Sequence, residues 1–263
     1  MSVEIDRGLT DFRLHLMPSW ELWGNDRNIE VSTRQQRLLA FLAVQGSCRR
    51  ELVAGMLWPE SPEHCALDNL RVSIHKVSSE LPGLIRADRH ALGLAPHAWV
   101  DLHQEWQILG NTNTHESLRL PGTDSLLLGW YEDWVIEEQS RLQRARITYW
   151  HRVALTALAC CDYNAAVESA VQGLYLDVLD ETSLEIMVVA HLGLGQCISA
   201  LQAIVGFRRR ANLELGIAGS PALDRLEARV RLVAQTPVLP CTGKKPDYGS
   251  ATHWPAGRTL GVA

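Results

Sequence analysis

The segment that decides the fold is LWPESPEHCALDNLRVSIHKVSSELPG, residues 57–83. Its pattern predicts a helix capped by Ser61, with Pro62 in the first turn, that stops at Pro82-Gly83. Five apolar residues recur at helical spacing and therefore share one side of that helix: Leu67, Leu70, Ile74, Val77 and Leu81. This side is expected to anchor the helix to a hydrophobic core.

The other side of the same helix is polar and carries the candidate DNA contacts. They are Asn69, Arg71, Val72, His75, Lys76 and Ser79. A short hairpin is predicted next, with strands at 84–86 and 92–94 joined by a turn at 87–90. A helix that is held by one face and followed by a hairpin is the arrangement with which a winged helix enters a DNA major groove. The pattern therefore indicates a sequence-specific DNA binder.

Two of these side chains carry the hypothesis, and each has a plainer interpretation. Arg71 points in the right direction for a bidentate bond to guanine or for a phosphate clamp. Alternatively, it is a surface arginine paired with Asp68 or Glu63. Lys76 is expected to contact the DNA backbone, and the alternative is a solvated side chain.

The remaining contacts are open in the same way. His75 is a candidate contact to a base edge or a phosphate, and the alternative is that it contacts neither. Val72 either meets a thymine methyl group or packs against the hairpin. Near the hairpin tip, Arg86, Arg89 and His90 are expected to lie against phosphates or in a minor groove. The alternative is that these three are solvated turn residues.

Upstream of this segment the sequence predicts a small antiparallel sheet and two helices. The strands are expected at 12–16, 20–23 and 29–31, with a turn at 24–26. The first helix begins at Ser32 or Thr33, where Thr33 and Gln36 have the spacing of a capping box. Arg34 and Arg37 are expected to be solvated side chains of this helix, and the alternative is that they reach DNA phosphates. The second helix is expected at 49–57. Eight residues are expected to be buried by the two helices: Leu38, Leu39, Phe41, Leu42, Leu52, Val53, Met56 and Leu57.

Downstream of residue 100 the pattern is helical. Helices are predicted at 132–160, 164–176, 182–194 and 198–215, and a shift of 34 residues superposes Ala166 on Ala200 and Ala170 on Ile204. This is the period of tetratricopeptide helix pairs. Further expectations are core positions for Trp130, Trp134, Trp150, Cys160 and Cys161, and a solvated helix face for the three arginines at 208–210.

The predicted fold is mainly α and divides the chain into three parts. Residues 1–100 form an α+β winged-helix domain with an N-terminal sheet, 101–234 form an all-α tetratricopeptide-like domain, and 235–263 form a mobile tail.

Composition and motifs exclude several classes of protein. The chain has 263 residues, 46% hydrophobic and 21% charged, which is typical of a globular protein. It contains no signal-peptide pattern, no apolar run long enough to span a membrane and no C-x-x-C pair. Motifs of phosphate loops, nucleophile elbows and zinc hydrolases are missing as well. We therefore expect a cytoplasmic, nucleoid-associated protein that is not an enzyme and has no cofactor or metal.

The charge balance bears on how such a protein would bind DNA. The net charge of −5 argues against a nonspecific nucleic-acid coat, whereas residues 34–89 contain eight Lys or Arg against six acids. This small surplus predicts modest affinity for one subunit, and hence binding as a homodimer or to tandem sites.

The sequence resembles the Streptomyces antibiotic regulatory protein family of transcriptional activators, from about Phe12 to Val233. Besides the segment quoted first, the resemblance rests on RQQRLLAFLA (34–43), VDLHQEW (100–106), LLLGWYEDWVIEEQSRL (126–142), DYNAAVESAVQGLYLD (162–177) and LELGIAGSPALDRLEARV (213–230). It implies a response-regulator-like winged helix joined to a bacterial transcriptional activation domain, direct-repeat operators in promoter DNA, and contact with RNA polymerase subunits. The polymerase contacts implied are the helical domain and five residues of one loop: Trp58, Glu60, Ser61, Glu63 and His64.

One departure from the family pattern affects the prediction. Recognition helices of this family usually end in a basic run, where this chain has Ser78-Ser79-Glu80. Each missing arginine removes a phosphate contact. The predicted function is an activator that binds promoter repeats and recruits polymerase; the alternative is a tetratricopeptide-like adaptor with weak or lost DNA binding. The residues neither support nor exclude a small metabolite sensed by the helical domain.

Overall fold

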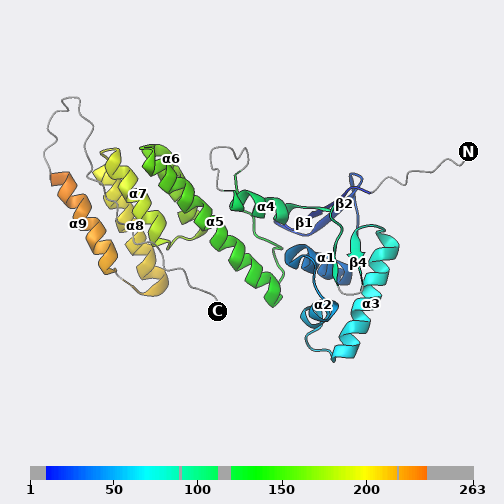
Figure 1. Cartoon of the computed structure of the whole chain (residues 1–263). Coiled ribbons are helices and arrows are strands. Elements are labelled where there is room, and N and C mark those ends of the chain that lie inside the picture. The colour runs from blue at the N-terminus through cyan, green and yellow to red at the C-terminus, as the bar shows by residue number, and fades with distance from the viewer. Residues whose placement is uncertain (1–9, 89–90, 112–119, 218, 236–263) are drawn as a thin grey trace, which may run out of the picture.

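The computed structural model describes residues 10–88, 91–111, 120–217 and 219–235. An α+β N-terminal part is followed by an all-α C-terminal part, which confirms the predicted fold class. Figure 1 shows the long helix α5 (Asp133–Ala159) reaching from the N-terminal elements to the C-terminal helices. Among the described helices, none is long and apolar enough to cross a membrane. The predicted tail lies outside the described residues, apart from Gln235.

The N-terminal sheet has four strands in the order β3-β2-β1-β6. Strands β1 (Phe12–His15), β2 (Glu21–Gly24) and β3 (Arg27–Asn28) are antiparallel, and β6 (Trp99–Val100) is parallel to β1. The third strand was expected at 29–31, which is wrong. Asn25 and Asp26, with φ of 49° and 60°, form a two-residue turn, so β3 pairs with β2 immediately after it.

Three helices and a hairpin follow the first three strands. They are α1 (Thr33–Gln45), α2 (Arg50–Leu57), α3 (Glu63–Glu80), β4 (Ile85–Ala87) and β5 (Leu92–Leu94). The capping box of α1 joins Ser32 to Gln35 instead of Thr33 to Gln36, because Gln35 Oε1 accepts the Ser32 backbone N–H at 2.9 Å. The N-cap of α3 is Pro62 and not Ser61.

Helix α2 buries fewer side chains than its sequence predicts. Val53 and Leu57 are buried, as expected, but Leu52 is 51% exposed and Met56 is 37% exposed. Ala54 completes the buried side of this eight-residue helix. Leu52 and Met56 lie one turn apart on its outer side.

The N-terminal core continues into the helical part of the chain. Helix α4 (Asp101–Gly110) follows β6 directly and contacts β1, and the Asp101 carboxylate accepts the backbone N–H groups of Leu16 and Met17 at 2.8 and 3.0 Å. Phe41 of α1 packs edge-on against Trp134 of α5 with ring centroids 5.4 Å apart. The predicted core positions of Trp130, Trp134 and Trp150 are therefore confirmed, Trp130 being partly buried.

The C-terminal helices form pairs with the predicted period. They are α6 (Tyr163–Leu176), α7 (Glu181–Gly193), α8 (Cys197–Leu215) and α9 (Pro221–Gln235). Ala166 and Ala170 of α6 and their counterparts Ala200 and Ile204 of α8 are all buried. The sequence analysis did not predict α9 as a separate helix.

Two expectations for this part are wrong. Cys160 and Cys161 are exposed, because they lie in the corner between α5 and α6, where Cys161 has a φ of 59°. The arginine run at 208–210 is not simply solvated, since Arg208 pairs with Asp224 and Glu227 of α9 at 2.6 and 3.0 Å.

Candidate nucleic-acid interface

Helix α3 presents the polar face that its sequence predicts. Leu70, Ser73 and Val77 are buried on the inner side, and Leu67 and Ile74 are partly buried. Figure 1 shows α3 at the edge of the molecule away from α6–α9. Five of the six candidate contacts on this helix are exposed: Arg71, Val72, His75, Lys76 and Ser79. The described residues of the chain therefore leave most of the outer face of α3 uncovered.

Arg71 has a partner within its own helix. Its guanidinium donates to Asp68 Oδ1 at 2.5 Å, and both side chains are largely exposed, at 76% and 66%. An ion pair at this exposure contributes only about 0–1 kcal/mol, so exchange of Asp68 for a phosphate or guanine costs little. Arg71 is thus a surface arginine paired with Asp68, and this weak pair still leaves its guanidinium available to DNA.

Asn69 is the candidate contact that faces inward. Its Oδ1 accepts from Arg34 Nη2 at 3.0 Å, and the Arg34 guanidinium lies 5.6 Å from the centroid of the Trp58 ring. Asn69 therefore joins α3 to α1 and to the α2–α3 loop. Arg34 is exposed, as expected, but it is a structural contact between elements.

The hairpin β4–β5 stands next to α3 and is fixed at its base. Leu92 pairs with Cys48, and a Cβ on Gly93 would lie only 3.2 Å from Ser47 Cα, so this strand packs closely on the end of α1. Arg50 Nη2 donates to the Asp88 carbonyl at 3.2 Å. Arg86 is exposed on β4, whereas Arg89 and His90 lie outside the described residues.

The loop expected to contact polymerase connects α2 to α3. Trp58 is half-buried beneath Arg34, while Glu60, Glu63 and His64 are exposed and Ser61 is half-buried. His64 Nε2 lies 3.2 Å from Cys65 Sγ. The loop thus leaves an acidic, accessible surface at the N-terminal end of α3.

Sequence reasoning missed two ion pairs that hold the start and the middle of α5, one to α1 and one to α4. Arg37 was expected to be solvated, but it donates to Glu132 Oε1 at 2.9 Å and to the Leu57 carbonyl at 3.1 Å. In the interior, Arg146 of α5 pairs with Glu105 of α4 at 2.8 Å, and both side chains are less than a tenth exposed. The signal in the sequence was a charged residue within an otherwise apolar helix face. Such a residue predicts a buried ion pair, but the sequence does not identify its partner.

A second cluster shows why side-chain identity alone does not make a catalytic site. His151 Nε2 lies 2.5 Å from Asp180 Oδ2 and 3.2 Å from Ser183 Oγ, a set of residue types that hydrolases use. Ser183, however, is fully buried, and Asp180 caps α7 by accepting the Ser183 backbone N–H at 2.9 Å. Burial opposes ionisation of Asp180, yet hydrogen bonds from Ser183 and His151 outweigh it and lower the pKa of this carboxyl. The cluster therefore joins α5 to α7.

In the part of the chain that the structure describes, no three His, Cys, Asp or Glu side chains lie close enough together to bind a metal ion. No protein-family model matches the chain, and no curated protein matches it significantly. Among solved structures, the chain is similar to EmbR of Mycobacterium tuberculosis, recorded in complex with a low-affinity phosphopeptide. The identity is 15% and the TM-score 0.47, over 85% of this chain. The chain spans 65% of the length of that EmbR chain.

Proposed function

We propose that this protein is a sequence-specific DNA-binding transcriptional activator. In this proposal α3 enters the major groove, the hairpin β4–β5 contacts the adjacent backbone, and the helical part recruits RNA polymerase. The observation that supports it best is the exposed outer face of α3 opposite an inner face that packs on the core. Such a face on a helix followed by a hairpin has the geometry of direct readout.

The charges at this face set the expected strength of binding. Arg71, Lys76 and Arg86 are exposed cations on α3 and β4, while Ser78, Ser79 and Glu80 leave the end of α3 without a basic group. Few phosphate contacts per subunit predict weak binding by a single copy. We therefore propose that two or more copies bind repeated sites, with homodimer contacts on DNA.

The test is binding of the full chain to promoter fragments from its own genome and to a pool of random duplexes, at two or more salt concentrations. Arg71→Ala and Lys76→Ala are compared with Arg144→Ala, which removes an exposed arginine of α5 far from α3. Loss of one phosphate contact reduces the slope of log affinity against log salt by about 0.9. We expect Arg71→Ala or Lys76→Ala to lower affinity at least about tenfold, and Arg144→Ala to leave it unchanged.

A second arm separates DNA binding from polymerase recruitment. Glu60→Ala and Glu63→Ala alter exposed acids of the α2–α3 loop and of the first turn of α3, without removing a cation from α3. They are expected to reduce transcription from a bound promoter while leaving the affinity for DNA intact. Transcription with purified polymerase, measured beside the binding assay, checks this.

The alternative function is a protein-interaction adaptor, and one observation favours it. The end of α3 lacks the basic residues that a DNA backbone would attract, and Arg71 is already paired with Asp68. Absence of salt-dependent binding to every duplex, with no effect of Arg71→Ala or Lys76→Ala, would establish the adaptor and reject the activator.

A further inference from the structure

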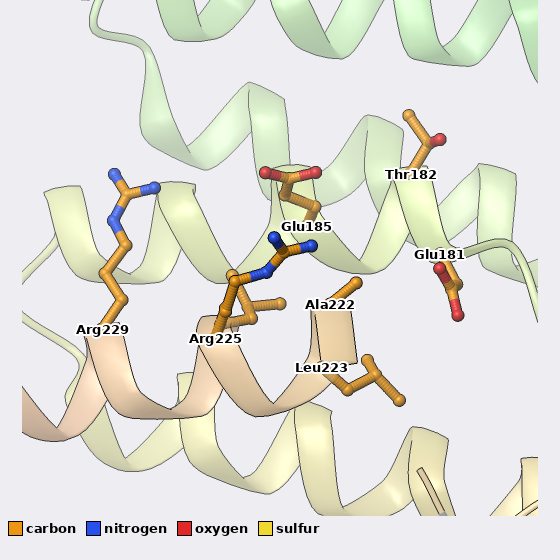
Figure 2. A pocket seen from close by; sticks show the side chains of 8 residues that line it. Glu181, Thr182, Glu185, Ala222, Leu223, Arg225 and Arg229 are labelled. Carbon is orange, nitrogen blue, oxygen red and sulfur yellow. The ribbon is translucent and has the colours of Figure 1, made fainter. Parts of the chain in front are cut away.

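A charged cavity lies between the helices α7 and α9, remote from the proposed DNA-binding face. Its volume is about 350 Å³. Glu181, Thr182 and Glu185 come from α7, and Arg225 and Arg229 come from α9. Leu223 and Leu226, both largely buried, form its apolar floor. Figure 2 shows both arginine side chains extending from α9 toward α7, on which Glu185 is labelled.

The two arginines are an unusual pair for a surface helix. Arg225 and Arg229 are one turn apart, so their like charges repel each other and destabilise the helix by a few tenths of a kcal/mol. The acids of α9 do not relieve this repulsion. Asp224 pairs with Arg208, and Glu227 pairs with Arg208 and Arg231. Among the described residues, neither Arg225 nor Arg229 has an ion-pair or hydrogen-bond partner.

The facing helix repeats the pattern with the opposite sign. Glu181 and Glu185 are also one turn apart, and both are exposed. Glu181 accepts a long hydrogen bond from Ser220 at 3.4 Å, while within the described part of the chain Glu185 has no partner. The cavity therefore has one wall of two guanidinium groups and one wall of two carboxylates, and among the described residues no ion pair joins the two walls.

A ligand that fits this arrangement carries an anionic group and a protonated amine close together. We propose that the cavity binds a small zwitterion of the free α-amino acid class. The ligand carboxylate accepts charge-assisted hydrogen bonds from Arg225 and Arg229. The ligand ammonium group donates to Glu185, and an apolar side chain covers Leu223 and Leu226. A single amino acid fits within a cavity of about 350 Å³.

Binding also has a structural consequence for the last helix pair. Helix α9 packs on α7 and α8 through a small core that contains Leu223, Leu226 and Val230. A ligand that bridges the arginines of α9 to the glutamates of α7 would stabilise this packing. Because a ligand that binds the folded state raises its stability, thermal unfolding reports on occupancy.

The experiment measures thermal unfolding and calorimetric titration of the full chain with L-leucine, followed by the other common amino acids in pools. N-acetyl-L-leucine, which lacks the ammonium group, and L-leucinamide, which lacks the carboxylate, are run beside them, as is inorganic phosphate. We expect at least one free amino acid to bind saturably and to raise the unfolding temperature. Its acetylated and amidated forms should bind at least about tenfold more weakly.

Variants locate the site. Arg229→Gln and Glu185→Gln change exposed side chains that have no hydrogen-bond or ion-pair partner among the described residues, and both are expected to weaken binding at least about tenfold. Arg209→Gln, an exposed arginine of α8 outside the cavity, should bind like the unaltered chain. Failure of every free amino acid to bind at millimolar concentration overturns the proposal. Equal binding of the capped forms, equal binding of phosphate alone, or insensitivity to both variants overturns it too.

Discussion

Replacement of Arg146 by Met is the sharpest test of how α5 is held to α4 and to the segments around it. The Arg146 guanidinium donates to Glu105 Oε1 and to the Asp124 carbonyl, each at 2.8 Å, and to Met17 Sδ at 3.4 Å. It thus connects α5 to α4, to the loop before α5 and to the segment that follows β1. Met fills a similar apolar volume but makes none of these polar contacts.

The expected loss of stability in Arg146→Met follows from the Glu105 carboxylate, which stays buried without its partner. Glu105 has 7% of its side chain exposed, and without Arg146 its carboxylate still accepts the Gly122 backbone N–H at 3.1 Å. Removal of one member of a buried ion pair costs about 3–5 kcal/mol, because the other charge is left without compensation. Arg146→Met is therefore expected to lower the free energy of unfolding by that amount.

The assay is equilibrium unfolding in urea, followed by tryptophan fluorescence and by circular dichroism in parallel. Arg144→Met, which alters an exposed arginine on the same helix, should change stability by less than about 0.5 kcal/mol. In the double variant Glu105→Gln/Arg146→Met, the amide carries no charge and still accepts the Gly122 N–H. The free energy of unfolding of the double variant should exceed that of Arg146→Met by at least about 1 kcal/mol. A loss below about 1 kcal/mol for Arg146→Met, or a double variant as unstable as the single one, would refute the reasoning.

Two further predictions concern the helical part. In Gly173→Ala the added Cβ would lie 2.1 Å from Ser183 Oγ and 3.2 Å from Ser183 Cβ, so we expect a loss of about 1–3 kcal/mol in urea unfolding. Gly55→Ala, with open space around its Cβ on α2, should instead gain about 0.5–1 kcal/mol, and equal effects of the two changes would contradict the packing. Asp180→Asn keeps an N-cap acceptor but removes the charge beside His151, which should cost about 1 kcal/mol at pH 7. Because the pKa of Asp180 lies below its ordinary 3.8, its charge stabilises the fold above that pH and this contribution disappears as the pH falls through the folded pKa. Unfolding at pH 5 and pH 3 should therefore show the difference between Asp180→Asn and the unaltered chain shrinking, and a constant difference would exclude the charge as its source.

Local sequence signals predicted the helices well. The seam of α3 and the buried pair Ala166 and Ala200 follow from periodicity, because helical geometry converts spacing directly into direction. Leu52 and Met56 show the limit of this approach. Their spacing marks one face of a helix, but whether that face is covered depends on which neighbours are present, and α2 is covered on the side of Val53 and Leu57.

The candidate DNA contacts divide along the same line. The exposure of Arg71, His75 and Lys76 was predictable, since they lie opposite the apolar seam of a single helix. The inward role of Asn69 was not, because its partner Arg34 is 35 residues away and belongs to α1. Whether the exposed residues read bases stays a prediction until the binding experiment is done.

Most of the helices, though not α9, were predictable from the sequence, as were the hairpin and the polar face of α3, because each depends on residues that are close together along the chain. Only the tertiary structure showed that Arg37 of α1 meets Glu132 at the start of α5 and that Arg146 of α5 meets Glu105 of α4. It also decided the cavity between α7 and α9, whose arginines and glutamates lie about forty residues apart in the sequence. The physical reason is that a charge has no preferred partner along the chain. Packing selects that partner by bringing two distant segments within a few ångströms and excluding the water that would otherwise solvate both.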